Sequence, residues 1–277
     1  MNAPLAGLRF SLAGPGRVGS SLARWALAAG AELAAVAGRR VGEPAWPGGP
    51  ARIALEDLET AGQDLLLIAV GDGDLSAVAA RLARRPQART VLHTSGSLDA
   101  GVLAPLKEAG AATGSLHPLK AFPTPLPDLA EARGVFFALD GDPEARALAG
   151  RLAAAWGGVS AEVPPAARPL YHFAATLAAG GIVTLLATAE EIAGRLGLPP
   201  EVTRGYLELA RGALAGAIQA QQDGRPLGQA VTGPAARGDR ATLLRHLEVL
   251  GASAPEEMPL AMFLWLETLR RTGKDLG

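Results

Sequence analysis

The stretch Arg9–Leu27, RFSLAGPGRVGSSLARWAL, decides the fold because a glycine-rich turn joins an apolar strand-like run to an amphipathic helix-like run. Its glycines, Gly14, Gly16 and Gly19, have the spacing GxGxxG. Between a strand and a helix, the first glycine permits a tight turn, the second lets the main chain approach a diphosphate, and the third allows close packing of helix on strand. A chance turn is the alternative in a chain with 35 glycines, but the context predicts nucleotide binding.

The composition limits the class of protein. The chain has 277 residues, 49% of them hydrophobic, which suffices for one large or two modest cores. Its net charge is -1 and its few lysines are far apart, so we expect no nucleic-acid partner. It has no cysteine and no histidine–carboxylate spacing typical of a metal site, so we expect neither disulfides nor a metal. The N-terminal residues do not resemble a secretion signal, and we expect a cytoplasmic location.

Strand-like and helix-like runs alternate over the first part of the chain, which is typical of parallel strands joined by helical crossovers. We predict strands at 8–13, 32–37, 64–70, 90–94, 112–115, 135–139 and 161–163, and helices at 19–29, 74–84, 100–110 and 143–156. Further helices are expected at about 169–196, 200–222, 240–250 and 255–272. The predicted fold class is α/β: a Rossmann-like, doubly wound, mostly parallel sheet in residues 1–164, followed by an all-helical domain in residues 165–277.

The segment Leu170–Ala189 has no charged side chain and is the strongest challenge to a soluble protein. Its apolarity is mild, because it contains His172, threonines and a Gly-Gly pair. A helix covered by protein therefore explains it better than a membrane span. Formation of a homodimer through the helical domain would provide that cover.

The residues after the second predicted strand indicate which dinucleotide binds. Enzymes that use the non-phosphorylated cofactor have an acidic residue about 20 positions past the glycine motif. Here the strand is followed by Gly38, Arg39 and Arg40, and the next acidic residue is Glu43. Two guanidinium groups, with Arg17 of the turn as a third, suit a ribose 2′-phosphate. NADP is the predicted cofactor; solvated loop arginines are the alternative.

Loops at the carboxyl ends of two further strands are also expected to contact the cofactor. The predicted cofactor-binding residues are Gly14, Pro15, Gly16, Arg17, Val18, Gly19, Gly38, Arg39, Arg40, Val70, Gly71, Asp72, His93, Thr94 and Ser95. Alternatively, Asp72 or Asp74 and Ser97 cap the helices that follow them.

The block HTSGSLDAGVLAPLKEAGAATGSLHPLKAFP (His93–Pro123), with AVGDGDL (Ala69–Leu75) and VTGPAARGD (Val231–Asp239), resembles an uncharacterised family of Rossmann-like proteins whose C-terminal half is domain of unknown function 2520. The likeness spans nearly the whole chain. It implies an NADP-binding domain and a helical domain similar to those of 6-phosphogluconate dehydrogenase and pyrroline-5-carboxylate reductase, usually dimeric, with no established substrate. Such proteins often carry an asparagine where this chain has Gly180 or Gly181.

Three residues are candidates for catalysis, because hydride transfer to a carbonyl or imine needs a proton donor near the reacting atom. His117 and Lys120 follow a predicted strand, and His172 lies near the start of the apolar helix, where the related dehydrogenases place a catalytic side chain. Structural histidines, held by hydrogen bonds in a loop or at a domain interface, are the alternative. His246 is interpreted as an ordinary helix residue.

Thr232 and Arg237 are candidates for binding a substrate carboxylate, since the equivalent loop of similar reductases closes over the substrate, often from the partner subunit. A capped turn with a surface arginine is the alternative. We therefore expect an NADP-dependent oxidoreductase that acts on a small, anionic carbonyl or imine compound. Two other hypotheses stay open: a non-catalytic NADP-binding sensor, favoured by Gly180–Gly181, and an enzyme that uses a deazaflavin.

Overall fold

The computed structural model describes residues 3–122 and 126–274. One seven-stranded sheet has the order β2-β1-β3-β4-β5-β6-β7. Its strands are β1 (Arg9–Ala13), β2 (Glu32–Ala37), β3 (Leu65–Ile68), β4 (Thr90–His93), β5 (Ala112–Pro118), β6 (Phe136–Gly141) and β7 (Val159–Glu162). Only the β5–β6 pair among these is antiparallel, so the predicted mostly parallel sheet is confirmed.

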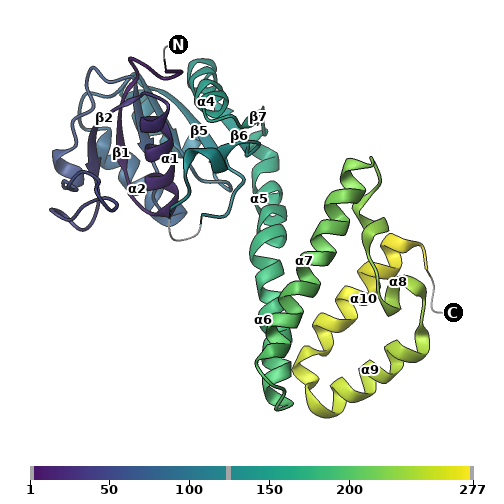
Figure 1. Cartoon of the computed structure of the whole chain (residues 1–277). Coiled ribbons are helices and arrows are strands. Elements are labelled where there is room, and N and C mark those ends of the chain that lie inside the picture. Colours follow the sequence, from purple (N-terminus) through teal and green to yellow (C-terminus); the bar gives the residue numbers. More distant parts are fainter. Residues whose placement is uncertain (1–2, 123–125, 275–277) are drawn as a thin grey trace. The chain divides into compact units, whose positions relative to one another are not determined.

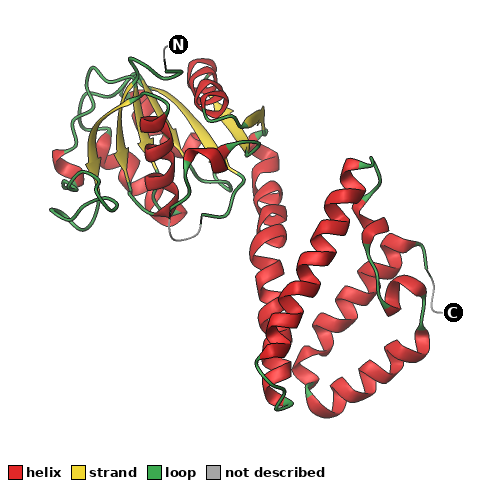
Figure 2. Cartoon of the chain, in the orientation of Figure 1, coloured by secondary structure: helices red, strands yellow, loops and turns green. Residues whose placement is uncertain are grey.

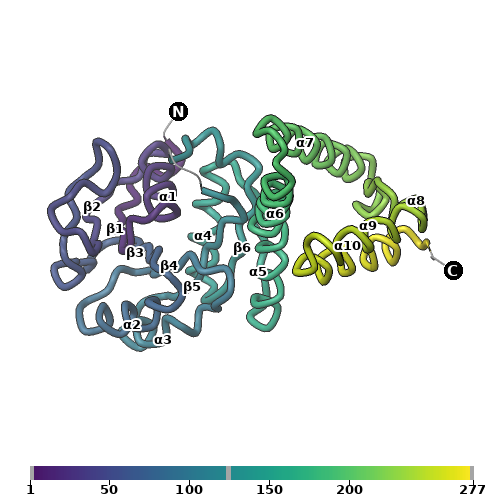
Figure 3. Tube along the Cα trace, turned by 90° about the horizontal axis from the view of Figure 1, so that it is seen from below, coloured from purple at the N-terminus to yellow at the C-terminus, as the bar shows by residue number. Residues whose placement is uncertain are grey.

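Helices cover both faces of this sheet (Figure 3). One face packs against α1 (Arg17–Ala28) and α4 (Pro143–Ala155), the other against α2 (Asp72–Leu82) and α3 (Ala104–Glu108). All four residues of β3, LLLI, are buried, because a central parallel strand is covered on both sides. Short 3-10 helices lie at Leu55–Asp57, Ala100–Leu103, Leu129–Ala132 and Pro165–Ala167.

The strand order determines where a ligand can bind. The chain enters the sheet at β1, adds β2 on one side and then returns to add β3 on the other. The connections after β1 and β3 therefore leave in opposite directions, and a crevice opens between them at the carboxyl ends of the strands. The glycine turn lies at this position, between β1 and α1.

The chain divides into two compact units, Met1–Ala179 and Gly180–Gly277, called unit 1 and unit 2 below. Unit 1 includes α5 (Arg168–Thr176), which the sequence prediction assigned to the helical domain that begins at residue 165. A π-helical segment, Leu177–Gly181, contains the division between the units and joins α5 to α6 (Ile182–Arg195). The domain boundary proposed from the sequence stays a prediction.

The regular elements of unit 2 in its described residues are all helices, joined by loops (Figures 1 and 2). Besides α6 it contains α7 (Glu201–Gln222), α8 (Pro234–Arg237), α9 (Arg240–Ser253) and α10 (Met258–Thr272), with 3-10 helices at Leu227–Ala230 and Pro255–Glu257. Asp239 caps α9 by accepting a hydrogen bond from the main-chain N–H of Thr242 at 3.1 Å. Large apolar side chains such as Leu209, Phe263 and Leu266 are exposed, so the chain by itself does not cover the helical surface.

The continuous helical stretch Pro165–Arg195 is long and apolar enough to cross a membrane, with a mean hydropathy of 1.6 over its most apolar window. None of that window is buried in the single chain, and the expected cover by a second copy stays a prediction. Length and apolarity alone are weak grounds for a membrane span, because core helices of soluble proteins share them.

Candidate functional site

The turn between β1 and α1 has the geometry that its glycines predict. Gly14 adopts φ +93°, and a Cβ there would lie 2.6 Å from the carbonyl oxygen of Ala69. Both the positive φ and this close approach require glycine. A Cβ on Gly19 would overlap the carbonyl oxygen of Gly14. Gly14 and Gly19 are thus explained by the sterics of a tight strand–helix connection.

Gly16 has a different role, because it leaves the amino end of α1 open. It is the N-cap residue of α1, and no side chain caps this helix. A Cβ on Gly16 would meet nothing within 4 Å. The first N–H groups of a helix have no acceptor within it and carry partial positive charge, so this end can bind an anion. The residues present fit the diphosphate of a dinucleotide.

A cleft of about 790 Å³ opens on one side of the turn and is called the arginine cleft. It is lined by Gly14, Pro15, Gly16, Gly38, Arg39 and Arg40 of the predicted cofactor residues, together with Arg52. Arg52 is brought to the cleft by pairing of the adjacent Ile53 with Ala37 at the end of β2. No local signal in the sequence distinguishes Arg52 from other loop arginines, and sequence reasoning missed it.

The arginines of this cleft differ in whether a nearby carboxylate compensates their positive charge. Arg40 and Arg52 both approach the carboxylate of Glu43, at 3.4 and 3.5 Å. The Arg52 side chain is only 10% exposed, and its Nε has no hydrogen-bond partner. Arg39 makes no ion pair or side-chain hydrogen bond with the described residues. The cleft therefore offers at least one uncompensated guanidinium group.

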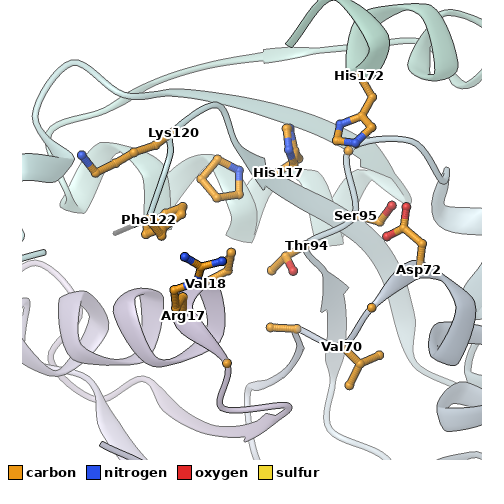
Figure 4. Close-up of a pocket in the computed structure, with 15 residues that line it drawn as sticks. Arg17, Val18, Val70, Asp72, Thr94, Ser95, His117, Lys120, Phe122 and His172 are labelled. Atoms are coloured by element: carbon orange, nitrogen blue, oxygen red, sulfur yellow. The ribbon is translucent and has the colours of Figure 1, made fainter. Parts of the chain in front are cut away.

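A second cleft, of about 340 Å³, opens on the other side of the turn and is called the histidine cleft (Figure 4). The predicted residues that line it are Gly16, Arg17, Val18, Val70, Gly71, Asp72, Thr94, Ser95, His117, Lys120 and His172. Gly16 lines both clefts, so they meet at the amino end of α1. The folded chain thus brings together most of the residues that the sequence singled out.

The alternative of helix capping is wrong for the loops after β3 and β4. The N-cap of α2 is Gly71, and no side chain caps that helix. Asp72 instead accepts a hydrogen bond from the Ser97 hydroxyl at 2.5 Å, which ties the two loops together. The turn after Ser97 is capped by Asp99, whose carboxylate accepts from the main-chain N–H of Gly101.

His93 lies beneath the histidine cleft and lines neither cleft. Its ring is fully buried; Nδ1 accepts from the main-chain N–H of Ser95, and Nε2 lies 3.2 Å from the carbonyl oxygen of Asp99. Burial lowers the pKa of His93 to about 4, so the ring is neutral and donates from Nε2. This geometry favours a role in shaping the loop of Ser95 over the predicted cofactor contact.

His117 and His172 come together from β5 and α5. Their ring centroids are 5.6 Å apart at an interplanar angle of 82° (Figure 4). Burial lowers the pKa of His117 to about 4, with further lowering by His172 and Arg168. The His172 Nδ1 is buried without a hydrogen-bond partner. The two rings therefore form one wall of the cleft, in which the His117 ring is neutral and His172 Nδ1 has no hydrogen-bond partner.

Gly96 allows the two rings to approach the loop. A Cβ at this position would lie 2.5 Å from His172 Nδ1 and 2.7 Å from His117 Nε2. Any side chain there would displace at least one ring, because real Cβ atoms do not come so close to other atoms. Nothing in the sequence HTSGS indicates that Gly96 contacts the site.

Arg168 holds the first turn of α5 against the sheet, and sequence reasoning missed it. Its side chain is completely buried and forms an ion pair with Asp140 at 3.7 Å. It donates hydrogen bonds to the carbonyl oxygens of Ser95 and Leu98, at 3.1 and 3.0 Å, and to the Ser115 hydroxyl. Arg168 thus fixes the helix that carries His172 to the loop that lies under it.

Lys120 lies at the histidine cleft as predicted, whereas the two residues predicted to bind substrate lie in unit 2. Lys120 lines the histidine cleft, but its Nζ lies 3.5 Å from the Glu131 carboxylate, and its side chain extends away from the histidines (Figure 4). Thr232 and Arg237 are exposed residues of unit 2, beside and within α8. Their role in binding substrate stays a prediction.

Comparison with known families matches two segments of the chain. Residues 5–118 match the Rossmann-like domain, and residues 135–261 match a domain of unknown function, DUF2520. The chain combines a Rossmann-like domain with DUF2520. The resemblance inferred from the sequence is therefore confirmed. No curated protein matches the chain.

Solved structures share the fold along nearly the entire chain. A Bacteroides fragilis protein, described as a proposed NADP oxidoreductase, is 20% identical with a TM-score of 0.74, covering 94% of this chain and 97% of that one. Pyrroline carboxylate reductase of Plasmodium falciparum with NADP bound is 14% identical, with a TM-score of 0.63 and coverage of 97% and 99%. A reductive aminase of Aspergillus terreus in complex with NADPH is 17% identical, with a TM-score of 0.54 and coverage of 97% and 96%. The TM-scores and coverages show that the chain shares its fold with these three proteins.

Proposed function

We propose that this chain binds NADP(H) across the two clefts and transfers a hydride between the cofactor and a small carbonyl or imine compound. The observation that carries the proposal is the uncapped amino end of α1 at Gly16, which lines both clefts. A diphosphate at this end would extend one nucleoside toward Arg39 and Arg40 and the other toward the histidines. Relatives of the same fold with NADP or NADPH bound support it.

Each cleft has a separate task in this proposal. In the arginine cleft, Arg39 and Arg40 would bind the ribose 2′-phosphate, with Arg52 held behind them by Glu43. In the histidine cleft, His117 and His172 would bind the reacting group of the substrate, since each ring has a nitrogen atom without a hydrogen-bond partner in the described part of the chain. The nicotinamide, when bound, supplies or accepts the hydride.

Calorimetric titration with NADPH and NADH tests the cofactor assignment. The native chain should bind NADPH more tightly than NADH. Arg39→Ala should weaken NADPH binding by about 1.5–3 kcal/mol, the scale of a charge-assisted hydrogen bond, and leave NADH binding unchanged. Arg89→Ala, an exposed arginine at the amino end of β4, is the matched control and should change neither. Equal affinity of the native chain for both cofactors would refute the phosphate assignment.

Oxidation of NADPH in the presence of keto acids, imino acids and neutral ketones tests the reaction itself. Turnover with one of these classes, lost in His172→Ala without loss of NADPH binding, supports the oxidoreductase. Tight NADPH binding with no turnover across the panel favours the sensor hypothesis instead. A chromophore that co-purifies with the chain and absorbs in the visible range would favour a deazaflavin.

We also propose that two copies associate through the helices of unit 2. The support is the large exposed apolar surface there, which includes Leu209, Phe263 and Leu266, against few buried large side chains such as Leu243 and Leu269. Exposed apolar patches of this kind mark interaction surfaces. Sedimentation velocity of the native chain and of Phe263→Glu checks this: a dimer that dissociates in the variant is expected, and a monomeric native chain contradicts it.

A further inference from the structure

Tyr171 lies beside His117, which lines the histidine cleft. Its phenolic oxygen is 3.0 Å from His117 Nδ1, and the two rings meet edge-on at 88° with centroids 5.6 Å apart. On the opposite side of the imidazole, Nε2 faces Gly96. The hydrogen bond directs Nδ1 toward α5, and Nε2 then lies toward the loop after β4.

The ring of His117 is neutral, so it has one N–H and one lone pair. Burial lowers the pKa of His117 to about 4; His172 and Arg168 lower it further, and Asp72 opposes them. Burial raises the pKa of Tyr171, so the phenol keeps its proton. The side chains around the pair thus leave two neutral partners that share one hydrogen bond.

The direction of that hydrogen bond follows from relative acidity. Either the phenol donates to Nδ1, or an N–H at Nδ1 donates to the phenolic oxygen. The unprotonated imidazole nitrogen is much the stronger base, and the phenol O–H is the ordinary acid of the two. The phenol of Tyr171 is therefore the donor, and the proton of His117 must be on Nε2.

We propose that Tyr171 is a positioning residue that keeps the proton of His117 on Nε2, from which the neutral ring donates a hydrogen bond to a ligand in the histidine cleft. Nε2 has no hydrogen-bond partner in the part of the chain that the structure describes. The proposal rests on the proposed function and narrows its substrate. The atom that meets His117 is a hydrogen-bond acceptor, such as a carbonyl oxygen or an imine nitrogen.

In this arrangement His117 contributes a hydrogen bond, and the proton that completes an alcohol or amine product comes from solvent water. A neutral imidazole can polarise a carbonyl group through its N–H alone, and it keeps its proton while negative charge develops on the oxygen. His117 acts in this way only if Nδ1 is occupied by a donor. Without the hydroxyl of Tyr171, both tautomers become accessible, and a fraction of the rings presents a lone pair to the ligand.

The ring-nitrogen NMR spectrum of the ¹⁵N-histidine-labelled free chain tests the proposal without cofactor or substrate. His117 should show a protonated Nε2 and an unprotonated Nδ1 at pH 7.5, with its signals assigned from their loss in His117→Gln. His93 is an internal reference, because the Ser95 N–H fixes the same tautomer there. In Tyr171→Phe the ratio of the tautomers of His117 should shift about two- to tenfold toward protonated Nδ1, as expected for one lost hydrogen bond.

Tyr206→Phe is the matched control, because Tyr206 on α7 is the chain's other tyrosine. It should leave the signals of His117 unchanged. A native spectrum with the proton of His117 on Nδ1 overturns the proposal even if Tyr171→Phe does not fold. An unchanged spectrum in a folded Tyr171→Phe also overturns it. Failure of NADPH to bind in the titration above overturns the proposed function. It does not affect the tautomer measurement, which tests the role of Tyr171 independently.

Discussion

Replacing Arg168 by methionine should lower the free energy of unfolding of unit 1 by about 3–5 kcal/mol, the cost of breaking a buried ion pair by removing one partner. The side chains of Arg168 and Asp140 are 0% and 8% exposed. Methionine fills much of the volume but leaves the Asp140 carboxylate without its cation. The carbonyl oxygens of Ser95 and Leu98 also lose their donor. These losses share one side chain and are not additive, so the expected total stays within about 3–5 kcal/mol.

Urea denaturation followed by tryptophan fluorescence measures this loss, since Trp25, Trp46 and Trp156 are all in unit 1. A lower midpoint at unchanged slope is expected. Arg151→Met, an exposed arginine on α4, is the control and should change stability by less than about 0.5 kcal/mol.

A second substitution tests the cause of the loss. Asp140→Asn in the Arg168→Met background should recover part of the stability, because it removes the uncompensated buried charge. A loss below about 1 kcal/mol in Arg168→Met, the scale of a surface pair, would refute the argument that this buried cation holds α5 against the sheet. Failure of the double variant to recover would show that the hydrogen bonds, and not the charge, dominate.

Three other changes have defined outcomes. Gly14→Ala should lower the free energy of unfolding by at least about 1 kcal/mol more than Gly62→Ala in urea titrations, because both have positive φ but only the former places a Cβ 2.6 Å from a main-chain oxygen. Gly96→Ala should move the ring ¹⁵N signals of the two histidines that face it, whereas Gly73→Ala, which meets nothing within 4 Å, should not. Stability should fall as the pH is lowered from about 6.5 toward 4, because the pKa of His93 is about 4 in the folded chain and the unfolded chain takes up the proton first. The same titration of His93→Gln should have a shallower slope, and identical slopes would contradict this assignment.

The strands, the crossover helices and the glycine turn could be predicted because their signals are local. Leu65–Ile68 is a run of apolar residues long enough for one buried strand, and the spacing of Gly14 and Gly19 reflects contacts within a single strand–turn–helix unit. The loops with Arg39, Thr94 and His117 could be assigned to one edge for the same reason. Carboxyl ends of parallel strands always meet there.

The inner wall of the site could not be inferred in this way. Arg168 meets Ser95 across 73 positions of the chain, and Tyr171 meets His117 across 54. These contacts depend on α5 packing back against the sheet, where the buried cation of Arg168 pairs with Asp140 and the half-buried phenol of Tyr171 bonds to His117. The order of residues over short stretches determines where helices and strands form and which residues a tight turn requires. Which polar groups satisfy one another once water is excluded is decided only when segments distant in the chain pack together.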